Sequence, residues 1–376
     1  MRRELERIEI PREHEARERT WAVVGTAFAE RQPVERRSYH LRPALTIVVA
    51  LAAVAAALSP PGRAVIAEIR EAVGVEHAQQ ALFSLPSEGD VLVSSDAGVW
   101  SVHADGSRRL LGGYREATWS PFGRFVAAVR NNELAALEPD GDVRWTLPRP
   151  GVRSSRWAGT ATDTRIAYVD RTGIRVVAGD GTGDRLVVAG ARGPLAWHPG
   201  PSHVLAYAPP REVRVQDADT GELLWRGARP AGPATGVEWS SDGLRLLVLS
   251  PHHLRVYDVR VYGRRGRIVD GEDSSEGWTD VAATFRPDSH EVAVARVHGS
   301  QSTAYVLSGR DLFNGTGIFR ELEWTPDGRW LLVTWPTADQ WVFVRADGRR
   351  IRAVSNISEQ FRSRTFPTVD GWCCAR

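Results

Sequence analysis

The chain has 376 residues, of which 42% are hydrophobic and 25% charged, and its formal net charge is +2. This composition is typical of a folded protein and excludes an intrinsically disordered chain. The near-neutral charge argues against a dedicated nucleic-acid surface, so we expect no nucleic-acid partner. All 48 basic residues are Arg. The sequence therefore excludes a Schiff-base lysine, a phosphate-loop lysine and a Ser–Lys dyad.

Residues 1–42 form a highly charged segment with ten Arg and eight Glu. Within it, residues 12–30 are expected to form a short amphipathic helix, because Trp21, Val24 and Phe28 recur at helical spacing on one face. Two interpretations stay open. The helix is either a solvated stalk beside a membrane, or a docking helix whose Trp/Val/Phe face binds a cytoplasmic partner.

Residues 43–62 are uncharged and are long enough to cross a bilayer as a transmembrane helix. The small residues Ala55–Ala57 would also suit a cleaved signal peptide, but the 42-residue leader favours an uncleaved anchor. Arg36, Arg37 and Arg42 flank the N-terminal side. The positive-inside rule then predicts a single-pass protein of the cytoplasmic membrane, with a cytoplasmic N-terminus and an extracytoplasmic C-terminal domain.

Residues 63–81 are expected to form a linker helix, since Val65, Ile66, Ile69 and Val73 share a face. Beyond it, a Trp-centred pattern repeats through residues 82–376. Each copy has an apolar strand that ends in an aromatic residue, a turn and further apolar strands. The aromatic anchors are 38 to 46 residues apart, which is the length of a four-stranded propeller blade; they are Trp119, Trp157, Trp197, Trp239, Phe285 and Trp324.

The turns after the anchors carry the clearest motif. Trp324–Arg329 reads Trp-Thr-Pro-Asp-Gly-Arg, and Trp119–Arg124 reads Trp-Ser-Pro-Phe-Gly-Arg. Asp and Gly are the residues that tight hairpin turns need. The pattern resembles the repeats of WD40-like, TolB-type (PD40) propellers, which implies a β-propeller over residues 82–376. Two segments, 136–145 and 217–225, also resemble quinoprotein propeller repeats, in which the Asp-Gly turn and the late Trp are packing features that imply no quinone.

The number of blades depends on the two ends of the domain. Residues 82–112 contain strands but lack a preceding anchor, and the C-terminal segment Val369–Cys373 contains an orphan anchor, Trp372. Joined, they would complete a seventh blade and remove the open sheet edges. We therefore predict an all-β fold of seven four-stranded blades, closed by the N- and C-terminal strands and preceded by a transmembrane helix. Six blades plus a partial one is the alternative.

No motif in the sequence predicts catalysis. We find no nucleophile elbow, HExxH, Walker loop or EF-hand loop, and the histidines show no metal-ligand spacing. The basic run Arg260–Arg267 is expected to be a solvated hairpin or loop, with contact to a phosphate or another polyanion as the alternative. Cys373 and Cys374 are adjacent and would form either a vicinal disulfide or two free thiols. We expect no catalytic residue, no metal and no cofactor.

These observations favour a membrane-anchored, extracytoplasmic propeller that acts as a non-enzymatic binding or sensing module for a protein or a ligand. A specific version is a regulator that resembles an anti-sigma factor, although residues 1–42 lack the His-x3-Cys-x2-Cys zinc motif of that family. The alternative is a propeller enzyme, a hydrolase, lyase or quinoprotein, with its site in the central channel. Titratable side chains that converge in the channel would favour the enzyme.

Overall fold

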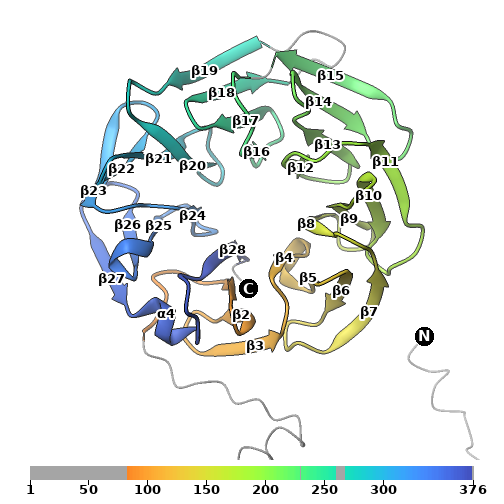
Figure 1. Ribbon diagram of the computed structural model, residues 1–376, viewed down its shortest axis with the longest axis horizontal. Helices are drawn as coiled ribbons and strands as arrows, with labels where there is room; N and C mark the ends of the chain where they lie inside the picture. Colours follow the sequence, from red (N-terminus) through yellow and green to blue (C-terminus); the bar gives the residue numbers. More distant parts are fainter. Residues whose placement is uncertain (1–82, 229, 260–266, 375–376) are drawn as a thin grey trace, which may run out of the picture. The chain divides into compact units, whose positions relative to one another are not determined.

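Seven four-stranded antiparallel sheets are arranged in a ring around a central axis (Figure 1), and we call the region along this axis the channel. This computed structural model describes residues 83–228, 230–259 and 267–374. The seven blades predicted from the anchor spacing are confirmed, and the alternative of six blades plus a partial one is wrong.

Each blade begins at the channel and ends at the perimeter. Blade 1 contains β28 (Thr368–Cys373), β1 (Asp90–Ser95), β2 (Gly98–Val102) and β3 (Arg108–Gly112). Blade 2 contains β4 (Glu116–Trp119), β5 (Val126–Arg130), β6 (Glu133–Leu137) and β7 (Val143–Pro148). Blade 3 contains β8 (Arg153–Gly159), β9 (Thr164–Val169), β10 (Gly173–Ala178) and β11 (Arg185–Ala189).

The remaining blades follow the same order. Blade 4 contains β12 (Leu195–Trp197), β13 (Val204–Tyr207), β14 (Glu212–Asp217) and β15 (Leu223–Ala228). Blade 5 contains β16 (Gly236–Trp239), β17 (Arg245–Ser250), β18 (His253–Asp258) and β19 (Arg267–Asp273). Blade 6 contains β20 (Thr279–Phe285), β21 (Val292–His298), β22 (Gln301–Val306) and β23 (Arg310–Thr316). Blade 7 contains β24 (Leu322–Trp324), β25 (Trp330–Trp335), β26 (Gln340–Arg345) and β27 (Ile351–Ser355).

The ring closes where the C-terminal strand β28 pairs with β1, as the orphan anchor predicted. Trp372 lies opposite Val91 in this antiparallel ladder. The helical elements in the described part of the chain are short: η2 (Pro121–Gly123), η3 (Pro336–Ala338) and α4 (Ile357–Gln360). Because both chain ends contribute to blade 1, this blade has four strands like the other six.

The hydrophobic core consists of clusters that lie between neighbouring blades. One cluster joins Ala304 of blade 6 to Leu331 and Trp324 of blade 7, and another joins Leu134 of blade 2 to Ile166 and Trp157 of blade 3. All the aromatic anchors are buried, with between 3% and 9% of their surface exposed: Trp119, Trp157, Trp197, Trp239, Phe285, Trp324 and Trp372. The repeat therefore places one large apolar side chain at each innermost strand.

The turn after an anchor is held by its own side chains. In blade 7, Thr325 Oγ1 accepts a hydrogen bond from Trp330 N at 3.0 Å and donates one to Asp327 at 2.5 Å. Asp327 in turn accepts a hydrogen bond from Arg329 N at 3.0 Å. Gly328 has a φ of 63°, which an L-residue adopts only under strain. The Thr-Pro-Asp-Gly sequence is thus explained by turn formation.

The propeller has two faces, which we name by their loops. The anchor-turn face carries the turns that follow the innermost strands, such as residues 325–329. The connector face carries the loops that join one blade to the next, such as residues 190–194, and the loops between the second and third strands, such as residues 208–211. Antiparallel order within each blade puts these two groups of loops at opposite ends of the strands.

Several sequence predictions lie outside the described residues. They are the charged segment 1–42 with Trp21, Val24 and Phe28, the transmembrane helix 43–62, the linker helix 63–81 and most of the Arg260–Arg267 run. Among the residues that the structure describes, none of the helices is long and apolar enough to cross a membrane.

Candidate functional site

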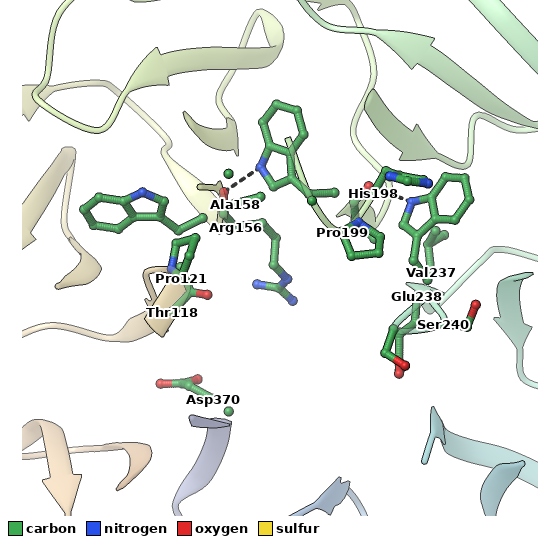
Figure 2. A pocket seen from close by; sticks show the side chains of 18 of the residues that line it. Thr118, Pro121, Arg156, Ala158, His198, Pro199, Val237, Glu238, Ser240 and Asp370 are labelled. Carbon is green, nitrogen blue, oxygen red and sulfur yellow. Dashed lines mark hydrogen bonds between the residues drawn. The ribbon is translucent and has the colours of Figure 1, made fainter. Parts of the chain in front are cut away.

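A cavity of about 570 Å³ lies at the mouth of the channel, on the anchor-turn face (Figure 2). Many of its lining residues occupy one position of the repeat, directly before an anchor: Thr118, Arg156, Ala196, Glu238 and Glu323. The closing strand β28 adds Asp370 and Gly371. The same repeat that builds the core therefore also places a side chain from each of several blades at the channel mouth.

Anchors form one wall of this cavity. Trp197 Nε1 donates a hydrogen bond to the carbonyl of Arg156 at 2.9 Å, and Trp239 Nε1 donates one to the carbonyl of Ala196 at 3.3 Å (Figure 2). His198 meets the Trp239 ring edge-on, with 4.8 Å between the ring centroids. Each of these indoles links its own blade to the channel strand of the preceding blade, so this wall is rigidly held.

Carboxylates on the channel strands join neighbouring blades. Glu238 on β16 accepts hydrogen bonds from Phe285 N at 2.9 Å and from Thr284 Oγ1 at 3.1 Å, both on β20. Glu323 on β24 accepts a hydrogen bond from Trp372 N on β28 at 3.2 Å. In both cases the carboxylate before one anchor accepts a hydrogen bond from the backbone N–H of the next anchor.

Asp370 makes the corresponding link across the ring closure. The register of β28 against β1 shifts between Val369 and Gly371, so Asp370 is the extra residue of a β-bulge. A bulge turns a side chain away from its regular direction. Here the carboxylate accepts a hydrogen bond from Ala117 N on β4 at 3.2 Å and another from Ser94 Oγ.

The channel carboxylates bind protons more tightly than ordinary carboxylates. Burial raises the pKa of Glu238 to about 8, and the charge of Glu323 adds to this rise. Burial likewise raises the pKa of Asp370 to about 8 and that of Glu323 to about 7. Near neutral pH, Glu238 and Asp370 are therefore mainly neutral, whereas Glu323 is divided between its neutral and charged forms.

Arg156 is the one arginine among the described residues that line the cavity. Its side chain is exposed and extends into the channel (Figure 2), and Nη1 donates a hydrogen bond to the carbonyl of Ser155 at 2.8 Å. Its positive charge lowers the pKa values of Glu323 and Asp370, partly offsetting their burial. The channel mouth thus combines several carboxylates with a single guanidinium group.

An exposed aromatic residue lies beside the channel on the same face. Phe122 occupies the Asp position of the anchor turn, has a φ of 64° and is 63% exposed. The next residue, Gly123, lies close to the sulfur atoms of Cys373 and Cys374, which form a vicinal disulfide in the structure. Of the two states that the sequence left open for these cysteines, the structure shows the disulfide.

The other candidate groups remain apart. His203 hydrogen-bonds Asp219 at 2.5 Å, His253 bonds Asp273 at 2.7 Å and His290 bonds Asp242 at 2.8 Å. Among the described residues, no group of three or more His, Cys, Asp or Glu side chains is arranged to hold a metal ion. The structure places the anchors around the channel, whereas Trp21, Val24 and Phe28 lie outside the described residues.

The channel carboxylates were missed by the sequence analysis. The available signal was the position before each anchor, which holds a charged residue in three repeats and a small one in the others; the charged residues are Arg156, Glu238 and Glu323. Asp370 carries no such signal, because the bulge that turns it inward depends on pairing with β1.

Comparison with known proteins supports the fold. No protein-family model matches the chain, and no curated protein matches it in sequence. The β-propeller domain of Cps50 (Swd1) from Myceliophteria thermophila is similar in structure, with a TM-score of 0.56 and 12% identity over 68% of this chain and 96% of that domain. The C-terminal WD40 domain of Sif2 has a TM-score of 0.52 and 14% identity over 78% of this chain and 85% of that domain.

A third similar structure is KlHsv2 with its loop 6CD replaced by a Gly-Ser linker. Its TM-score is 0.52, with 12% identity over 71% of this chain and 94% of that chain. Identities this low show the fold alone: the described residues form a WD40-type seven-bladed β-propeller.

Proposed function

We propose that this protein is a non-enzymatic binding module whose propeller receives a partner protein or ligand at the channel mouth of the anchor-turn face. The observation that carries the proposal is the cavity between the anchors, into which Arg156, Glu238 and Asp370 project from three different blades. Its volume of about 570 Å³ falls within the range of sites that hold small molecules or protruding side chains. Because Glu238 and Asp370 are mainly neutral near pH 7 and Arg156 carries a positive charge, the cavity favours a polar group that forms hydrogen bonds over a strongly charged one.

The hydrogen bonds of these carboxylates favour binding over catalysis. Glu238, Glu323 and Asp370 each accept a backbone N–H from the next blade, which fixes one side of the carboxylate in the wall of the ring. A rigid wall with partly charged groups suits recognition of a preformed ligand group. We therefore rank a binding role first.

A pair of matched substitutions tests the site. Ser241→Arg places a cation at the cavity, which Ser241 lines, whereas Ser308→Arg places one in an exposed turn of blade 6 on the same face. The wild-type full-length chain is cross-linked to its partner in native membranes. We expect the cross-linked partner to be lost with Ser241→Arg and kept with Ser308→Arg. A partner that remains fully cross-linked to Ser241→Arg would contradict binding at the channel mouth.

We also propose the membrane arrangement that the sequence predicts. The uncharged run 43–62 would anchor the protein in the cytoplasmic membrane, with the propeller outside and residues 1–42 inside. A phosphatase reporter fused after residue 90 should be active, because this enzyme matures only outside the cytoplasm. An inactive fusion would reject this topology.

Two finer assignments belong to the same proposal. The Trp324–Arg329 turn supports assignment of the repeats to the TolB-type (PD40) group within propellers. The helical face of Trp21, Val24 and Phe28 supports a cytoplasmic partner, as in a regulator that resembles an anti-sigma factor. Replacing these three residues with Ala should then disrupt the cytoplasmic interaction and leave partner capture by the propeller unchanged.

A propeller enzyme is the second candidate, and one observation favours it. Titratable groups do converge in the channel, including Glu238 and Asp370, whose pKa values of about 8 would suit proton transfer near neutral pH. Turnover of a hydrolase or lyase substrate by the wild type that is abolished by Glu238→Gln or Asp370→Asn, with the fold retained, would favour this candidate over binding alone.

A further inference from the structure

Exposed arginines gather on the connector face of blades 2 to 4, opposite the channel-mouth cavity. They come from separate loops: Arg115 follows β3, Arg171 joins β9 to β10, Arg192 joins β11 to β12, and Arg211 joins β13 to β14. Arg153 begins β8 on the same face and is half-buried. We call these five residues the arginine arc.

Contacts between the loops make the arc continuous. Arg115 Nη2 donates a hydrogen bond to the carbonyl of Val152 at 2.5 Å, so it links the loop before β4 to the loop before β8. A Cβ placed on Gly151 would lie 3.0 Å from the side chain of Arg171, which brings the β9–β10 loop against the same segment. Gly190 N donates a hydrogen bond to the carbonyl of Thr172 at 2.8 Å, and a Cβ placed on Gly193 would lie 2.7 Å from the carbonyl oxygen of Ala208. The loops that carry Arg192 and Arg211 therefore join the same surface.

The arc lacks the acidic partners that arginines on protein surfaces usually have. In the part of the chain that the structure describes, no carboxylate lies within 4 Å of any of its five guanidinium groups. The acidic residues nearby are already engaged: Glu133 pairs with Arg130 at 3.0 Å, and Glu212 accepts a hydrogen bond from Arg214 at 2.6 Å. Unpaired, exposed cations of one sign create a local field that attracts anions.

An apolar groove of about 750 Å³ lies within this arc, between blades 3 and 4. Its floor includes the buried residues Tyr207 and Ala208, and its sides include Pro209 and Pro233. Arg192 and Arg214 are also part of its lining. A groove of this kind suits an occupant with an apolar side chain and neighbouring negative charges.

The chemistry of the groove distinguishes a peptide from other polyanions. Tyr207 is only 2% exposed, and no other aromatic residue is among the described residues that line the groove. Single-stranded nucleic acids rely on exposed aromatic platforms for stacking, which this surface lacks. In an extended acidic peptide, one apolar side chain can enter the groove while Asp or Glu residues before and after it reach the arginines beside the groove.

We propose that the connector face of blades 2 to 4 binds an extended acidic peptide segment of a partner protein. An apolar side chain of the segment occupies the groove at Tyr207 and Pro209, and its carboxylates pair with Arg171, Arg192 and Arg211. This site is separate from the channel mouth, so the protein has two recognition surfaces on opposite faces.

The test selects peptides from a random twelve-residue display library on the full-length chain in detergent micelles. We expect enriched sequences to contain Asp or Glu around an apolar residue. Their affinity should fall about tenfold or more in the variant Arg171→Glu/Arg192→Glu/Arg211→Glu, and should weaken as salt is raised. Arg329→Glu is the matched control, because Arg329 is 74% exposed on the anchor-turn face, and it should leave the affinity unchanged.

Three outcomes would overturn the proposal. Enriched peptides without acidic residues would reject the charge complementarity. Acidic peptides that bind the triple variant as well as the wild type would place their site elsewhere. Tighter binding to vesicles of anionic lipid than to any selected peptide, lost in the same variant, would assign the arc to a membrane surface. Ser241→Arg separates the two sites, because it should block the channel mouth without affecting peptide binding.

Discussion

Charged side chains on the two faces of the propeller have different surroundings. At the channel mouth, Glu238 and Glu323 accept backbone N–H groups from the next blade and are partly withdrawn from water. On the connector face, Arg171 and Arg192 are exposed and, among the described residues, meet no carboxylate within 4 Å. The first group is bound into the ring and should affect its stability, whereas the second is free for a partner and should affect binding.

Removal of an anchor should have the largest effect on stability. Trp324 is 3% exposed and packs among Leu331 and Ala304, with the guanidinium group of Arg286 5.6 Å from its ring centroid. Trp324→Ala should lower the free energy of unfolding by about 3–5 kcal/mol, because it leaves a cavity between blades 6 and 7. Urea denaturation of the purified protein measures this loss.

The exposed aromatic of the same face provides the control. Phe122 is 63% exposed, so Phe122→Ala should change the free energy of unfolding by only about 0.5 kcal/mol or less. Equal losses of unfolding free energy for the two substitutions would mean that Trp324 does not stabilise the packing between blades. The distinction between side chains that hold the ring together and side chains that are free would then be wrong.

The channel carboxylates should make stability depend on pH. The pKa values of Glu238 and Asp370 are raised to about 8 in the folded protein, so the folded state holds protons that the unfolded chain releases near pH 4 to 5. Stability should therefore be highest near pH 5 and should fall as the pH rises through 8. The substitution Glu238→Gln removes one of these titrations while keeping an acceptor for Phe285 N.

Melting temperatures between pH 5 and pH 9 test this expectation. At pH 9, the free energy of unfolding of Glu238→Gln should exceed that of the wild type by roughly 1–3 kcal/mol, after allowance for partial exposure to solvent. This difference corresponds to a Tm that is several degrees higher. Glu222→Gln, at an exposed turn of the same face, should reproduce the wild-type pH curve. A wild-type curve that stays flat above pH 6 would show that the channel remains well hydrated.

The sequence predicted the ring because its signals are local. Each blade carries its own aromatic anchor and turn, and the spacing from Trp119 to Trp324 converts directly into blades. The sequence also predicted ring closure, because Trp372 is an anchor near the C-terminus that lacks the strands of a blade, whereas residues 82–112 contain strands but lack an anchor. The pairing of β28 with β1 joins distant parts of the chain, but it could be inferred from the repeat alone, because each end of the domain carries part of one blade.

The two sites could not be predicted in the same way. Glu238, Glu323 and Asp370 lie in different blades, and only the closed ring brings them to one cavity. The arginine arc is more dispersed still, since its members lie in separate loops that no repeat position relates. In a chain whose 48 basic residues are all Arg, single arginines in loops carry little information until the fold shows which of them lack a carboxylate.

The smallest expected change in stability is that of the arginine arc, and it separates a binding surface from a structural one. Arg171→Glu, Arg192→Glu and Arg211→Glu should each alter the free energy of unfolding by about 0.5 kcal/mol or less, because these side chains are exposed and lack ion pairs among the described residues. Since the arc concentrates charges of one sign, the triple variant should be slightly more stable than the wild type at low salt, and high salt should cancel the gain. Urea denaturation at two salt concentrations measures both effects. A loss of several kcal/mol would instead show that the arginines hold the blades together, as the channel carboxylates do on the opposite face.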